Sequence, residues 1–251
     1  MAEDKTEGTQ GAFPLDFEDK KTGKHPDLGS IQRNTETGVL PAIDVVKDRE
    51  RFFQGLKELL KLTSKSNKVE RNQAYIEKAI EILVLPIWGD IPDKRNADFD
   101  DFNGEHIRNM QITGDDIGKN AREFYFTNSV ALGLNAFRLA DNGNISGSLI
   151  VGDHSLEGSG LGPKSEDFIE RIMKSRGNTI ENSVLFGEGV LKYAHDGEIK
   201  NSIIGGIMPA TRALGLQLSN VYFVTPELTF QVKDHKLSGK GFRNVPISRI
   251  S

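Results

Sequence analysis

The chain has 251 residues, of which 37% are hydrophobic and 27% are charged, and its formal net charge is −4. These values are typical of one soluble domain, alone or with appendages, and the absence of cysteine excludes disulfides, thiolate metal sites and cysteine nucleophiles. A near balance of 32 basic and 36 acidic residues disfavours a nucleic-acid partner, which requires clustered lysine and arginine.

The N-terminus lacks the features of a targeting segment. The first residues, MAEDKTEGTQ, contain neither the basic nor the apolar stretch of a signal peptide, and no apolar run approaches the roughly 18 residues of a membrane helix. We therefore expect no membrane span. We expect a cytoplasmic location, or export by a route without a cleavable signal peptide.

Residues 1–40 are predicted to form a flexible N-terminal arm. They include eight acidic and five basic residues and too few apolar side chains to offset the entropy lost on ordering. One short apolar island, formed by Phe13, Leu15 and Phe17, interrupts this composition. We interpret the island as a candidate partner-binding motif, with docking on the chain's own body or plain disorder as alternatives.

Residues 41–104 are predicted to hold a helical hairpin and a linker. Apolar residues recur at spacings of three and four between Asp44 and Leu62, and again between Val69 and Leu83, which is the pattern of amphipathic helices. Pro86 lies beyond the end of the second stripe. A helical hairpin has too small a core to stand alone, so we expect its apolar face to pack on the part of the chain that comes after it.

A repeat with a period of 19 residues begins after the hairpin. Each unit has an apolar residue, a polar residue, Asn or Gly, usually Ser, and then two mostly apolar residues. The units begin at Ile107, Phe126, Ile145, Ile180, Ile199, Leu218 and Leu237. Five of the six intervals are 19 residues and the other is 35, which is one period with an insertion of 16. The insertion, near residues 158–176, is predicted to be a helix because Ser165 is a good N-cap before Glu166 and Asp167.

The repeat predicts a mainly β fold, with residues 105–251 forming a parallel β-helix of about seven 19-residue coils. A unit of this length is too short for two helices, and its β-branched residues and Asn-Gly or Asp-Gly turns favour short strands. Equivalent residues would then stack about 4.8 Å apart. One column consists of Asn109, Asn128, Asn182, Asn201 and Asn220, with Gly147 and Gly239 as gaps. We expect this column to form a structural ladder, because amides bond to one another and asparagine tolerates left-handed backbone at bends.

These repeats resemble the parallel β-helix (β-solenoid) proteins, a group that includes pectate-lyase-like enzymes, phage tailspikes and many adhesive or scaffolding proteins. The resemblance is architectural and covers roughly residues 105–245. No catalytic motif of those families matches, so none of their functional residues is transferred. A left-handed helix with six-residue repeats is the nearest rival, and its pattern is imperfect here. Because solenoid ends need caps, we expect the helical hairpin to cap the N-terminal end.

Two motifs of other site types are rejected. The segment Gly158–Ser165 is similar to a phosphate-binding loop, but Pro163 replaces the glycine before Lys164 and no strand context is evident. In a calcium-hand register centred on Asn103 and Gly104, the required carboxylate positions hold Phe99 and Met110. We therefore expect no cofactor and no metal, with a weak cation site in the acidic loop of residues 98–105 as the alternative.

The repeat register gives one candidate catalytic group. Asp153 and Glu188 are each eight residues into neighbouring coils, with His154 beside them and Lys192 four residues beyond Glu188. Two carboxylates of unlike environment beside a histidine can perform acid–base chemistry on a glycosidic bond. The competing interpretation is that they are hydrated turn residues.

Two functions are compatible with these sequence features. The favoured one is a non-enzymatic structural or interaction protein that uses the rigid solenoid as a scaffold for a protein partner or a second copy, as a component of an assembly or as a viral or injected bacterial protein. The alternative is a carbohydrate-active enzyme, a polysaccharide lyase or glycoside hydrolase, that uses the acidic pair on a polysaccharide. The outward faces lack aromatic platforms for sugars, and Trp88 lies outside the repeats. This observation favours the scaffold and leaves catalysis open.

Overall fold

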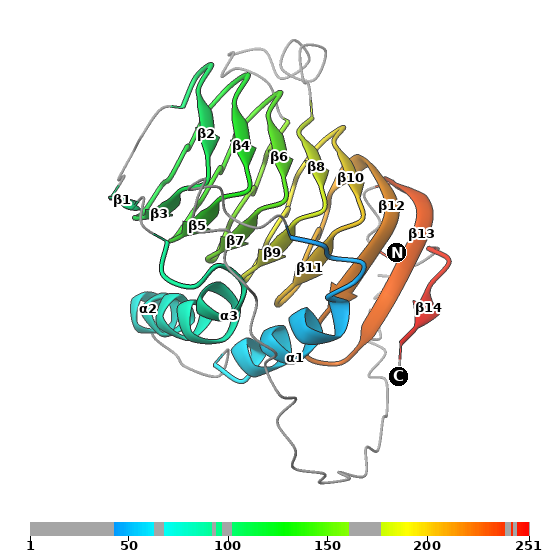
Figure 1. Ribbon diagram of the computed structural model, residues 1–251. Helices are drawn as coiled ribbons and strands as arrows, with labels where there is room; N and C mark the ends of the chain where they lie inside the picture. The colour runs from blue at the N-terminus through cyan, green and yellow to red at the C-terminus, as the bar shows by residue number, and fades with distance from the viewer. Residues whose placement is uncertain are drawn as a thin grey trace, which may run out of the picture. The chain divides into compact units, whose positions relative to one another are not determined.

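In a computed structural model, the chain folds into a parallel β-solenoid of about six coils (Figure 1). The structure describes residues 43–62, 68–91, 94–96, 102–160, 177–238, 242 and 245–250. The predicted arm with Phe13, Leu15 and Phe17 lies outside the described residues, as does the predicted inserted helix from residue 161 to 176. The predicted fold class, mainly β with a parallel β-helix, is confirmed.

Each coil contributes two short strands, which lie on two different faces of the solenoid (Figure 1). The first strands stack in the order β2 (His106–Arg108), β4 (Tyr125–Thr127), β6 (Asn144–Ser146), β8 (Thr179–Glu181), β10 (Glu198–Lys200) and β12 (Leu214–Val224). The second strands stack in the order β1 (Lys94–Asn96), β3 (Gln111–Thr113), β5 (Val130–Leu132), β7 (Leu149–Val151), β9 (Val184–Phe186), β11 (Ile203–Gly205) and again β12. With 11 residues, β12 is long enough to belong to both stacks.

The strand register follows the 19-residue repeat. Parallel pairs join the first residues of successive units: Ile107–Phe126, Phe126–Ile145, Ile145–Ile180, Ile180–Ile199 and Ile199–Leu218. The pairing of Ile145 with Ile180 shows that the coils before and after the 16 extra residues of the sequence stack in register. This apolar column is buried in the interior of the solenoid.

The seventh unit, which begins at Leu237, is not a coil. The chain turns at Thr225, whose N–H donates to the Leu228 carbonyl at 2.9 Å, and returns as β13 (Thr229–Ser238). β13 pairs antiparallel with β12 and places His235, not Leu237, beside Leu218. The short strand β14 (Ser248–Arg249) pairs antiparallel with β13. The structure therefore has about six coils instead of seven, because a tight turn reverses the chain.

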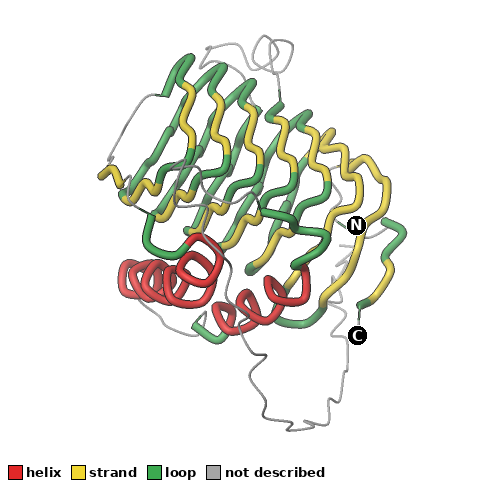
Figure 2. The backbone as a smooth tube through the Cα atoms, viewed as in Figure 1, coloured by secondary structure: helices red, strands yellow, loops and turns green. Residues whose placement is uncertain are grey.

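The helices form a layer along one face of the solenoid. α1 (Arg49–Leu60) contacts β11 and β12, and α2 (Lys68–Ala79) contacts β7. Figure 2 shows these helices together on one side of the stacked strands. In the described part of the chain, no helix is long and apolar enough to cross a membrane.

The second helical segment passes through Pro86 instead of ending before it. α2 continues through the π-helical turn η1 (Ile80–Val84) into α3 (Leu85–Trp88). Proline has no N–H to donate, and its ring crowds the preceding turn of a regular helix. The wider π-turn lies just before Pro86, so the regular hydrogen-bond pattern is already interrupted there: the Leu85 N–H bonds to the Ile80 carbonyl, five residues back.

The sequence predicted that the helical hairpin caps the N-terminal end of the solenoid. The helices instead cover an apolar sheet face along its side. The outward side chains of the second strands form one buried cluster with the helices: Val130, Leu132, Leu149, Val151, Val184, Phe186 and Ile203, joined by Tyr222 and Val224 of β12. A sheet face of this kind must be buried against another layer.

The outward side chains of β2, β4, β6, β8 and β10 are exposed or half-buried. We call this surface, with Gln217 and Ser219 of β12, the open face.

Candidate functional site

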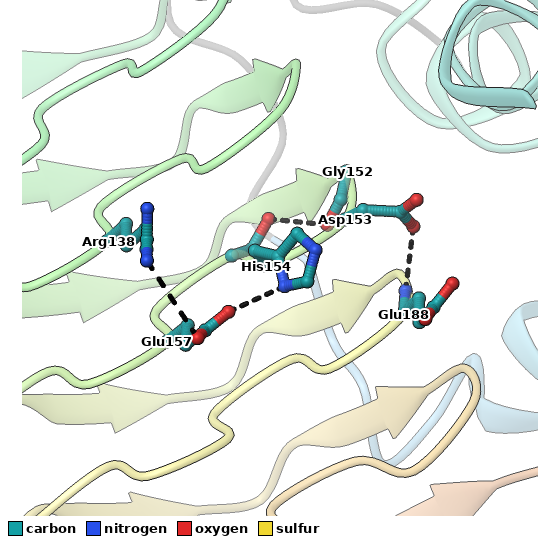
Figure 3. Close-up of polar contacts among 7 residues, drawn as sticks. Arg138, Gly152, Asp153, His154, Glu157 and Glu188 are labelled. Carbon is teal, nitrogen blue, oxygen red and sulfur yellow. Dashed lines mark hydrogen bonds and ion pairs between the residues drawn. The ribbon is translucent and has the colours of Figure 1, made fainter. Parts of the chain in front are cut away.

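The predicted acidic pair lies at the corner that follows the second strand of two neighbouring coils. β7 is followed by Gly152 and Asp153, and β9 is followed by Gly187 and Glu188. Both glycines have a φ of 153°, and a Cβ on Gly187 would lie 2.1 Å from the Gly152 carbonyl oxygen. Such close backbone contact is open only to glycine. It brings Asp153 directly beside Glu188 (Figure 3).

Asp153 is fully buried and bonds to the main chain of the next coil. Its Oδ1 accepts the Glu188 N–H at 2.8 Å. Asp115, at the same position two coils earlier, accepts the Leu134 N–H at 3.2 Å. A carboxylate at this position thus accepts a main-chain N–H that has no carbonyl partner in the regular hydrogen bonding between coils. Asp153 is therefore a hydrogen-bond acceptor between coils.

His154 points away from Asp153 and toward Glu157 (Figure 3). Its Nδ1 lies 2.5 Å from Glu157 Oε2, and Glu157 Oε1 lies 3.9 Å from Arg138 Nη2. The backbone of His154 is left-handed, with a φ of 61°, which turns its side chain to the other side of the corner. Sequence reasoning missed Glu157, although it follows Arg138 by one 19-residue period.

Lys192 is engaged elsewhere. Its Nζ lies 5.1 Å from the centre of the Tyr193 ring, a cation–π distance. Arg212, one coil further on, donates from Nη1 to the Tyr193 hydroxyl at 3.1 Å. The structure thus brings Asp153 and Glu188 together, but the four predicted residues do not converge on one point.

The contacts of Asp153 favour a structural role over a catalytic one. A general acid or base must reach the substrate within hydrogen-bonding distance, whereas the Asp153 carboxylate is enclosed and bonded to the main chain. Among the described residues, no group of three or more His, Asp or Glu side chains is placed to hold a metal ion. Comparisons with protein-family models, curated proteins and solved structures found no match to this chain. What bears on function is therefore the shape and chemistry of the molecular surface.

The asparagine column lies at the corner between the two strands of each coil. All five asparagines have left-handed backbone, with φ between 45° and 55°. Asn128 Nδ2 donates to Asn109 Oδ1 at 2.8 Å, and Asn220 Nδ2 donates to Asn201 Oδ1 at the same distance. These amides bond from coil to coil, so they hold the register of the corners.

Asn182 has different partners. Gly147 occupies the column in the preceding coil and offers no side chain. The Asn182 amide instead accepts the Val45 N–H at 3.1 Å and donates to the Ile43 carbonyl. It therefore anchors the segment that leads into α1, and so fixes one end of the helical layer on the solenoid.

We expect Asn182→Leu to release this segment and to lower the free energy of unfolding by about 1–3 kcal/mol, because two backbone groups lose their partner. Asn201→Leu is the matched control. Asn201 has similar backbone geometry, but its side chain accepts a hydrogen bond from Asn220 in the same column. Hydrogen exchange of the Val45 amide should accelerate in Asn182→Leu and stay at the parent rate in Asn201→Leu. Equal Val45 exchange in the two variants would contradict the anchoring role.

A buried serine column was missed as a structural element. Its members are Ser129, Ser148, Ser183 and Ser202, and all four are fully buried. Each hydroxyl donates to the carbonyl two residues earlier, at 2.6–2.9 Å, and accepts an N–H from the preceding coil at 3.2 Å. The signal was present, because serine recurs directly after the asparagine or glycine position. This column gives the buried serine hydroxyls, and the main-chain N–H groups that they accept from, their hydrogen-bond partners at the corners of the coils.

A groove at the end of the open face is the second candidate site. It has a volume of about 390 Å³ and lies on β10, β12 and β13. Its lining residues are Glu198, Lys200, Gln217, Leu218, Ser219, Asp234, His235 and Lys236. The sequence did not predict it, because it depends on the antiparallel return of β13.

The side chains of the groove form local pairs. Glu198 and Lys200 make an ion pair at 2.8 Å, and Ser219 Oγ donates to Asp234 Oδ1 at 2.6 Å. The hydrogen bond with Glu198 raises the pKa of Lys200 above its ordinary value, and the nearby charge of Glu181 acts in the same direction. Lys200 therefore remains a cation at neutral pH.

Proposed function

We propose that this protein is a rigid, non-enzymatic scaffold whose open face binds another protein. The proposal rests on the contrast between the two sheet faces. Helices bury the apolar outward side chains of β5, β7, β9 and β11, whereas the polar outward side chains of β2, β4, β6, β8 and β10 stay accessible. The serine and asparagine columns hold this surface in one shape, so a partner would meet a preorganised site.

The N-terminal end of the open face has the residue types of an interaction hot spot. His106 and Tyr125 stack with ring centres 4.3 Å apart and planes at 14°. Tyr125 is 43% exposed, and Arg108 is exposed on the same strand as His106. Tyrosine and arginine dominate the binding energy of many protein interfaces. These residues are therefore the best candidates for the centre of the contact.

The same geometry favours a protein over a polysaccharide. His106 covers one face of the Tyr125 ring, and Asn144 follows Tyr125 in register in the next coil. Contrary to the expectation from the sequence, the open face therefore carries one exposed aromatic ring, but His106 already occupies one of the two ring faces on which a sugar could stack. The carbohydrate-active alternative draws no support from Asp153 either, because that carboxylate is enclosed.

The test is site-specific photo-crosslinking in cells that make the protein naturally. A benzophenone amino acid replaces Tyr125 in one variant and Leu85 of α3, which is 47% exposed, in the control. We expect a discrete crosslinked product from position 125 that disappears when Arg108→Glu is added, and none from position 85. The same products from both positions, or no product from position 125, would contradict the proposal.

A further inference from the structure

The groove on β10, β12 and β13 has a charge pattern that follows from strand direction. Both outer strands carry an acid, one intervening residue and a lysine, in Glu198–Lys200 and in Asp234–Lys236. β10 runs parallel to β12 and β13 runs antiparallel to it, so the order of charges is reversed in space. The two walls of the groove therefore present opposite charges at each level.

The register fixes which charges face each other. Across Gln217, Glu198 on one wall lies opposite Lys236 on the other. Across Ser219, Lys200 lies opposite Asp234. The floor carries uncharged side chains and the walls carry two acids and two bases, so the groove as a whole is electrically neutral. A ligand that carries charge of one sign gains no net electrostatic attraction there. A surface with the same alternating charges can instead pair each charge with an opposite one.

We propose that this groove is the contact surface of a weak homodimer, in which two copies meet face to face about a two-fold axis parallel to β12. This inference rests on the proposed scaffold function and names a second copy as a partner of one part of the open face. Rotation about this axis exchanges the two walls of the groove and leaves each residue at the same height along the strands. Glu198 then faces Lys236 of the second copy, and Lys200 faces its Asp234, so every wall charge meets an opposite charge.

A two-fold contact of this kind is self-complementary, which is the condition for a closed dimer. A two-fold axis perpendicular to the strands satisfies the same four charges, but it superimposes the whole open face and places Arg108 on His106 of the second copy. The axis along β12 avoids this clash of basic groups. Among the described residues, no strand continues the sheet beyond the Asp234–Lys236 part of β13.

The geometry leaves the rest of each open face free. β8, β6, β4 and β2 extend away from β12 on one side, so in the dimer they extend in opposite directions from the axis. Tyr125 and Arg108 of each copy thus remain accessible. The dimer would present two copies of the proposed binding surface, which raises the apparent affinity for a multivalent partner.

The experiment uses two charge-uniform variants of the full chain. The acid variant is Lys200→Glu with Lys236→Glu, and the base variant is Glu198→Lys with Asp234→Lys. Sedimentation equilibrium is measured for each variant alone and for their equimolar mixture, over about 5 to 500 µM protein. Circular dichroism melts show that each variant is folded.

We expect the parent to be in a monomer–dimer equilibrium whose dissociation constant rises at least about tenfold between about 50 mM and 500 mM NaCl. Each variant alone should be monomeric, because like charges face each other, and the mixture should restore the dimer. Controls with the same change in net charge are Lys57→Glu with Lys233→Glu, and Glu77→Lys with Glu227→Lys, at exposed positions outside the groove. These controls should dimerise as the parent does.

A parent that stays monomeric over this range would overturn the proposal, as would a mixture that remains monomeric or controls that lose the dimer. Failure here is distinguishable from failure of the proposed function, because crosslinking at position 125 does not involve the groove. A crosslinked partner together with a monomeric parent would retain the scaffold and reject the dimer.

Discussion

Gly152→Ala is expected to lower the free energy of unfolding by about 4 kcal/mol or more. The Gly152 backbone has a φ of 153°, and an added Cβ would lie 1.8 Å from the carbonyl oxygen of Gly133 in the preceding coil. Both clashing atoms are fixed to the backbone, so no rotamer change relieves the overlap. The coils would have to separate at this corner, which would break the stacked strand pairs on either side.

Gly147→Ala is the matched control for this experiment. Gly147 also has positive φ, at 58°, but the nearest atom to an added Cβ would be 3.9 Å away. Alanine there should cost only about 1–2 kcal/mol, the usual penalty of left-handed backbone. Urea denaturation followed by circular dichroism gives both values. Equal losses at the two positions would mean that backbone strain, and not the contact between coils, accounts for the effect at Gly152.

Removal of the Asp153 acceptor is expected to produce the second large effect. Asp153→Leu should cost about 2–3 kcal/mol, because it leaves the partly buried Glu188 N–H without its acceptor and removes a carboxylate that is itself fully buried. Asp153→Asn keeps an amide oxygen in the same place and should cost no more than about 1 kcal/mol. Glu188→Gln serves as a control, since the bond uses the Glu188 backbone and not its side chain.

The same variants distinguish a structural aspartate from a catalytic one. A panel of acidic and neutral polysaccharides is assayed for new reducing ends and for unsaturated uronates. We expect no cleavage by the parent. Cleavage by the parent that falls at least about a hundredfold in both stable variants, Asp153→Asn and Glu188→Gln, would establish acid–base catalysis and overturn the scaffold proposal.

The solenoid could be predicted residue by residue because its geometry is local and repeated. Each unit has the same corner, and only a few residue types tolerate that corner, so the 19-residue period appears directly in the sequence. The interval of 35 residues did not disturb the prediction of the register, since Ile145 and Ile180 stack as the superposition of the repeat units predicts. The end of the repeat was mispredicted at Leu237, because a reversal at Thr225 depends on one turn and leaves no periodic signal.

The helical layer and the site could not be derived in the same way. The outward apolar residues of the second strands, such as Val130 and Leu132, are visible in the sequence, but the face they form exists only once the coils stack. The stacking of Asp153 and Glu188 was predictable from the register. The direction of each side chain was not, because the positive φ of His154 turns neighbouring residues to opposite sides of the corner.

The anchor between Asn182 and the segment before α1 bears on the order in which the chain is made. Its partners, Ile43 and Val45, leave the ribosome well before Asn182, from which they are separated by 139 and 137 residues. β11 and β12, which α1 contacts, are synthesised later still. During synthesis the apolar residues of α1 therefore stay exposed until β11 and β12 have been made. We expect a chaperone to bind these residues of the nascent chain until the last coils emerge.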